Sequence, residues 1–153
     1  MCYHRFGCES LSTPLLVFQA LYGTTGASNA ILRLVRNGEL QLAISVPVFE
    51  EYRDVLLRKK TLRQLALSSD DIQSVLEFVA LVAVRTPIDY LWRPNLKDET
   101  DNIFVELAVA SGSEYLVTQN VRDFTVGNEL RFDSFRIVTP SDFMTAWRNR
   151  SHG

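Results

Sequence analysis

The sequence has few cysteine and histidine residues. Cys2 and Cys8 both lie near the start, and His4 and His152 lie at opposite ends. A zinc site needs several such ligands, and a thiol nucleophile needs a nearby histidine base, so both kinds of site are disfavoured. Two cysteines also provide no disulfide framework, which favours a reducing compartment, and we expect the protein to be cytoplasmic.

An excess of positive charge and long apolar runs are also lacking. The net charge is −2 at pH 7, so any nucleic-acid binding must come from a local patch and not from the overall field. The apolar segment at residues 15–22 is short and contains Gln19, so we expect neither a signal peptide nor a membrane span. The composition, 46% apolar and 22% charged, suits a single globular domain over residues 1–153.

Apolar periodicity predicts strands that alternate with helices. Short apolar or β-branched runs predict strands at residues 15–18, 41–44, 83–86, 115–118 and 135–138. Helices are predicted at residues 28–37, 45–56, 68–80, 101–112 and 140–147. Residues 1–14 show no clear period. The alternation predicts a three-layer α/β fold with a mainly parallel central sheet.

Local signals indicate where several helices begin and end. Ser28 is a predicted N-cap, and so is Ser45, which precedes a first turn with Pro47. Ser68 and Asp71 have the spacing of a capping box. These signals depend only on short-range contacts, so we expect them to persist whatever the tertiary structure.

The segment at residues 98–124, DETDNIFVELAVASGSEYLVTQNVRDF, is the most informative part of the chain. Asp101 and Asn102 stand where a helix begins, and an apolar face follows up to Gly112, which suits a left-handed cap. A short run then predicts a strand buried on both faces, and Asp123 lies in the loop after it. The carboxyl end of a parallel strand is where ligands collect.

Three acids are candidates for a metal site: Glu51, Asp101 and Asp123. Strand carboxyl ends and helix amino ends share one edge of a parallel α/β sheet, so these side chains can converge despite their separation in sequence. Clustered carboxylates repel one another, and oxygen ligands select Mg²⁺ or Mn²⁺ to neutralise them. Such a site can activate water for phosphodiester cleavage.

Each of these acids also has a purely structural explanation. Asp98 and Asp101 are suited to capping a helix, and Asp123 is suited to forming a turn. Glu51 lies on a helix where acids and bases alternate, which is typical of a solvated surface. Glu106 is expected to be exposed or to support the site from behind. The residues alone therefore indicate an acidic site in an α/β domain and go no further.

A basic cluster, consisting of Arg58, Lys59, Lys60 and Arg63, follows the second predicted helix. A solvated helix end favoured by the helix dipole is the more common explanation of such a cluster. Contact with the backbone of RNA is the alternative.

From Val17 onward the sequence resembles PIN-domain proteins, in particular the bacterial and cyanobacterial group described as toxin components of toxin–antitoxin systems. The segments that carry this resemblance are VFQALYGTTGASNAIL, SVPVFEEYRDVLLR, LKDETDNIFVELAVASGSEYLVTQNVRDF and IVTPSDF. The resemblance implies an α/β/α ribonuclease that depends on Mg²⁺ or Mn²⁺ and acts on single-stranded RNA. It also implies a cognate antitoxin as a partner, and a homodimer.

The resemblance assigns roles to particular positions. Glu51 corresponds to the helix acid, Asp101 to the acid before the long apolar helix, and Asp123 to the acid of the NVRDF loop. Asn120 matches a polar position near the metal. These matches favour a site role for the three acids over the structural explanations.

The start of the chain departs from the family pattern. PIN domains begin with a strand that runs into Asp-Thr-Asn or Asp-Thr-Ser, and this aspartate is a principal metal ligand. Residues 13–15 or 12–14 occupy that place here, and neither set contains a carboxylate; the nearest acid is Glu9. Residues 1–16 look replaced and not shortened, as in a frameshifted, wrongly started or decayed reading frame. We therefore expect nuclease activity to be weak or absent.

Two functions follow from these observations. The first is a metal-dependent endoribonuclease of the toxin type, weakened by the missing aspartate. The second is a binding protein that keeps the PIN shape for RNA or an antitoxin without turnover. A phosphoacceptor or phosphatase ranks last, because it needs an aspartate after the first strand.

Overall fold

The computed structural model describes residues 9–12, 20–21, 26–88, 99–119, 121–124 and 135–151. Within these residues five short strands form one sheet in the order β3-β2-β1-β4-β5. The strands are β1 (Glu9–Ser12), β2 (Gln41–Ile44), β3 (Val84–Arg85), β4 (Tyr115–Val117) and β5 (Arg136–Val138). All paired strands are parallel, as the alternating pattern predicts.

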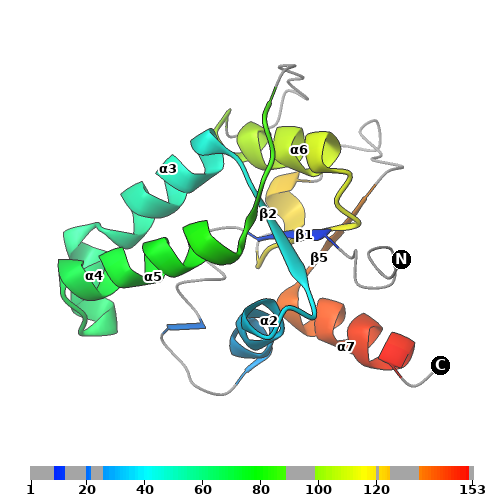
Figure 1. Ribbon diagram of the computed structural model, residues 1–153, viewed down its shortest axis with the longest axis horizontal. Helices are drawn as coiled ribbons and strands as arrows, with labels where there is room; N and C mark the ends of the chain where they lie inside the picture. Colours follow the sequence, from blue (N-terminus) through cyan, green and yellow to red (C-terminus); the bar gives the residue numbers. More distant parts are fainter. Residues whose placement is uncertain are drawn as a thin grey trace.

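In the described part of the chain, six α-helices with complete bounds and a short 3₁₀ helix surround the strands. The α-helices are α2 (Ala27–Arg36), α3 (Val46–Leu56), α4 (Lys59–Leu65), α5 (Ser69–Val82), α6 (Glu99–Ser111) and α7 (Pro140–Ser151), and the 3₁₀ helix is η2 (Val121–Phe124). Figure 1 shows α2 and α7 together on one side of the strands, with α6 and α3 on the other side. In the described part of the chain no helix is long and apolar enough to cross a membrane.

The core lies where α3, α5 and α6 pack against β2 and β4. Tyr52, Ile72, Leu107 and Leu116 are fully buried there. Phe143 of α7 packs edge to face on Tyr115 of β4, with ring centroids 5.2 Å apart. Aromatic side chains therefore hold α7 against the sheet, as buried apolar side chains do for α3, α5 and α6 on the other side.

Several sequence predictions about helix ends are confirmed. Ser45 caps α3, and its hydroxyl accepts a hydrogen bond of 3.3 Å from the backbone N–H of Val48. The capping box of α5 is present between Ser68 and Asp71. Gly112 ends α6 with φ of 66°, the left-handed conformation that glycine adopts without strain.

Other predictions need correction. The predicted first strand at residues 15–18 falls outside the described residues, whereas the central strand is β1, at residues 9–12, where no strand was expected. The sequence ESLS has no apolar run, but a strand with partners on both sides is held by backbone hydrogen bonds that need none. Helix α2 begins at Ala27 with Gly26 as its N-cap, so Ser28 lies inside the helix and does not cap it. Helix α7 continues to Ser151, beyond the predicted end.

The capping box of α5 makes stability depend on pH. The backbone N–H of Ser68, and then its hydroxyl, hold the pKa of Asp71 below its ordinary value of 3.8. Because folding lowers this pKa, the stabilisation is fully present above pH 3.8 and is lost as the pH falls through the folded-state value. We expect the thermal midpoint of Asp71→Ala to fall less on acidification than that of the wild type. Asp70→Ala, which removes a neighbouring acid outside the capping box, is the control and should keep the wild-type profile.

Candidate active site

The chain topology brings the starts of two helices and η2 to one edge of the sheet. Helix α3 begins directly after β2, through Ser45. Residues 112–114 join the end of α6 to the start of β4, so α6 runs antiparallel to β4. Helix α6 therefore begins at the edge of the sheet where the strands have their carboxyl ends. The η2 helix follows β4 at the same edge. This edge therefore carries the three elements that hold the predicted acids.

Glu51 is the least exposed acid of α3. Its neighbours Glu50 and Asp54 are exposed, whereas Glu51 is half-buried and precedes the fully buried Tyr52. Helix α3 also packs against α6. A solvated surface role, the alternative from sequence, suits Glu50 and Asp54 better than Glu51.

Asp101 and Asp123 are placed by their backbones. Asp101 is in the first turn of α6, which begins at Glu99, so Asp101 is not the N-cap that its position in the sequence allowed. Asp123 belongs to η2. The side chains of both residues lie outside the described part, as do Asn120 and Asp98 entirely.

The acids whose side chains are described do not form a metal site by themselves. Among the residues whose side chains are described, no group of three His, Cys, Asp or Glu residues lies close enough to hold a metal ion. The acids proposed for this edge, Asp101 and Asp123, have side chains outside that described set. The convergence of these two side chains with Glu51 stays a prediction.

Two polar residues are buried in α6, one helical turn apart. Asn102 is 5% exposed and Glu106 is 6% exposed. Of the two alternatives predicted for Glu106, exposure is wrong, and a supporting position behind the site stays a prediction. No hydrogen bond or ion pair joins its carboxylate to another described residue. A signal was present in the sequence, because Glu106 is the only charged residue in the run IFVELAVA. Helical side chains tilt towards the N-terminus, so Glu106 leans towards the start of α6 and the carboxyl edge.

Glu9 is placed too far away to replace the missing aspartate. It is paired with Gln41 at the amino end of β1, whereas Ser12 is paired with Val117 at the carboxyl end. Three residues of strand span about 10 Å. The acid nearest to the expected ligand position in sequence therefore starts from the opposite edge of the sheet.

The basic cluster lies away from this edge. Figure 1 shows α4, which carries Lys59, Lys60 and Arg63, at the far end of α3 from the sheet. Lys59 and Lys60 occupy the first turn of α4, where the helix dipole disfavours positive charge, so the dipole explanation is wrong for them. Arg58 pairs with Asp54 at 3.0 Å. Contact of this cluster with RNA stays a prediction.

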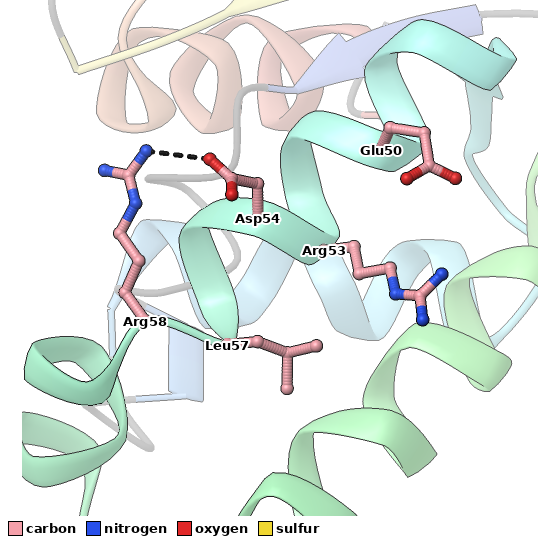
Figure 2. A pocket seen from close by; sticks show the side chains of 5 residues that line it. All are labelled: Glu50, Arg53, Asp54, Leu57 and Arg58. Atoms are coloured by element: carbon pink, nitrogen blue, oxygen red, sulfur yellow. Dashed lines mark hydrogen bonds and ion pairs between the residues drawn. The ribbon is translucent and has the colours of Figure 1, made fainter.

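A pocket beside this cluster is electrostatically balanced. Figure 2 shows Glu50, Arg53, Asp54, Leu57 and Arg58 around it. Its two acids and two arginines offset one another, and the Arg58–Asp54 pair occupies one of each. The pocket therefore offers no excess charge to an ionic ligand.

Comparison with known proteins identifies a family for this chain. Residues 15–122 match the family model of the PIN domain. A search among curated proteins finds no match. The match begins after β1, so the central strand of the sheet comes from sequence outside it. PIN domains are generally nucleases that depend on divalent metals. Because the match covers more than half of the chain and all but one of the strands up to β4, the chain belongs to the PIN domain family.

Proposed function

We propose that this protein is a metal-dependent endoribonuclease that acts on single-stranded RNA, with activity reduced by the missing aspartate. The observation that carries the proposal is the position of Glu51, the half-buried acid of α3, on a helix that packs against α6. Asp101 and Asp123 join Glu51 in the proposed site. Helices α2 and α7 on one side of the sheet and α3, α5 and α6 on the other form the layers of the proposed α/β/α architecture.

The donor set of this site fits a hard divalent cation. Glu51, Asp101, Asp123 and Asn120 offer only oxygen atoms to a metal in their usual states, and oxygen ligands suit Mg²⁺ and Mn²⁺. A cation held by the three acids supplies the positive charge that activates water for attack on a phosphodiester. Asn102 and Glu106 are buried along α6, and in this proposal they lie behind the acids.

A second function is favoured by the start of the chain. Strand β1 carries no aspartate, and its only acid, Glu9, is at the amino end. Loss of one carboxylate from a metal site lowers both metal affinity and the charge that holds the nucleophile. The alternative is therefore a PIN-fold protein that binds RNA or an antitoxin without turnover. In a toxin–antitoxin pair, the antitoxin would present an arginine or an amphipathic helix to the acidic edge, and the toxin would act as a homodimer.

The proposed function predicts residual cleavage that depends on Asp101. The purified chain is incubated with fluorescent single-stranded RNA and Mn²⁺, and cleavage is measured over time. We expect slow cleavage that is abolished by EDTA and falls to background in Asp101→Asn, because the variant removes a ligand charge without changing the side-chain shape. Asp70→Asn makes the same change in the first turn of α5 and should leave the rate unchanged.

Calorimetric titration with Mn²⁺ separates the two functions. Binding that is lost in Asp101→Asn supports the nuclease. No cleavage and no Mn²⁺ binding by the wild type would favour the binding protein without turnover.

A further inference from the structure

A second pocket lies between the two helices on the other side of the sheet. It is a cleft of about 490 Å³ between the first half of α2 and the first three turns of α7. Arg33 and Arg148 line it from the two helices, and Met144 and Ala30 add apolar surface. Helices α2 and α7 pack directly against each other, so the cleft is formed by elements far apart in sequence.

The charge of this cleft differs from that of the pocket in Figure 2. Arg33 and Arg148 are the only charged side chains among the described residues that line it. No ion pair or hydrogen bond joins the guanidinium of Arg148 to another described residue. The two helices together carry four arginines and one aspartate, in a chain whose net charge is −2. The described lining of the cleft therefore contains two arginines and no acid.

Backbone donors at the start of α2 suit a ligand with phosphate groups. The N-cap of α2, Gly26, makes no side-chain capping bond, and the first turn has no acid, so backbone N–H groups there can donate to an anion. Asn29 donates its amide N–H to the carbonyl of Ala20 at 3.2 Å. The Oδ1 atom of Asn29 is buried without a hydrogen-bond partner, so it is closed to solvent and to a ligand in this structure.

The cleft opens at the same edge of the sheet as the candidate active site. Residues 37–40 join α2 to the start of β2, so α2 begins at the carboxyl edge, and α7 begins directly after β5 at that edge. A polynucleotide chain passing over the acids at this edge can therefore continue into the cleft.

We propose that the cleft between α2 and α7 binds the backbone phosphates of single-stranded RNA through Arg33 and Arg148. The proposal rests on the proposed function, because it places the bound strand beside the acidic edge. Arg150 is not part of this contact, because it pairs with Glu114 and lies over the ring of Tyr115.

The test measures binding of a fluorescent single-stranded RNA to the full chain by anisotropy, in EDTA so that no cleavage occurs. We expect Arg33→Ala/Arg148→Ala to weaken binding about tenfold and to reduce the salt slope, d log K/d log[salt], by about 1.4, which corresponds to two lost phosphate contacts. Arg33→Lys/Arg148→Lys keeps the charges and should retain most of the affinity. Arg53→Ala/Arg85→Ala removes two exposed arginines on α3 and β3 and is the matched control, with unchanged binding.

Competition with adenosine monophosphate and with inorganic phosphate distinguishes an RNA strand from a free nucleotide. We expect the RNA to bind far more tightly than either. Equal binding by the monophosphate, RNA binding that is unaffected by the double variant, or no RNA binding at all would each overturn the proposal. Because the assay needs no metal, a chain that binds RNA through these arginines but cleaves nothing would refute the nuclease and leave the cleft proposal standing.

Discussion

Replacing Thr13 by aspartate should raise Mn²⁺-dependent cleavage of single-stranded RNA by about 100-fold or more, since a ligand carboxylate controls both metal affinity and the charge on the nucleophile. The position follows from β1, which ends at Ser12, so residue 13 is the first residue after the carboxyl end of the central strand. Residue 13 lies outside the described residues, and its place is taken from the sequence alone. The family pattern has its aspartate at this point in the chain.

The control for this gain adds the same charge elsewhere. Ser69→Asp introduces an acid in the exposed first turn of α5 and should leave the rate unchanged. Ser12→Asp tests the alternative alignment, in which the ligand position is one residue earlier. Adding Asp101→Asn to Thr13→Asp should remove the gained activity. A Thr13→Asp rate equal to that of the wild type, together with equal Mn²⁺ affinity, would show that the missing aspartate is not what limits this site.

The elements predicted correctly from the sequence are those whose apolar pattern and caps are local. Strand β4 was predicted from a run buried on both faces, and Tyr115, Leu116 and Val117 are all buried. Helices α3 and α5 were predicted from Ser45 and from the Ser68–Asp71 box, whose hydrogen bonds span only a few residues. Such contacts form in the same way in any tertiary structure, so the sequence is sufficient to predict them.

Strand β1 could not be predicted because its position depends on its neighbours. Ser10 is paired with Leu42 on one side and with Tyr115 on the other. These contacts come from residues about 30 and 100 positions away in sequence, as the pairing register records, and a strand of mixed polarity gives no apolar signal for them. The match to the PIN domain likewise begins only at residue 15.

The functional residues also divide into those that the local sequence indicates and those that depend on tertiary packing. Glu51, Asp101 and Asp123 could be proposed from sequence because each lies beside a predicted strand end or helix start. The burial of Glu106, and the position of Arg33 and Arg148 in one cleft, depend on how the helices pack. Exposed arginines on separate helices are common on solvated surfaces, so no sequence pattern distinguishes these two.

Replacing Glu106 by leucine should raise the free energy of unfolding by about 1–4 kcal/mol, because it exchanges a carboxylate on a buried residue, with no partner among the described residues, for an apolar side chain. Glu106 is 6% exposed, and Val105 and Leu107 beside it are completely buried. Leucine is close to glutamate in length and adds an apolar group to an apolar surrounding. Chemical denaturation of the wild type and of Glu106→Leu measures the difference.

The same variant tests why a carboxylate remains at this position. Ala110→Leu places leucine on an exposed site of the same helix and should change stability by no more than about 0.5 kcal/mol. If Glu106 supports the acids at the start of α6, then Thr13→Asp/Glu106→Leu should be more stable than Thr13→Asp but cleave RNA more slowly. If the variant is more stable and cleaves RNA at the same rate, Glu106 has no role in cleavage and only destabilises the fold. Stability lost in Glu106→Leu would show that the carboxylate has a partner that stabilises it, because an uncompensated buried charge cannot be worth keeping for the fold alone.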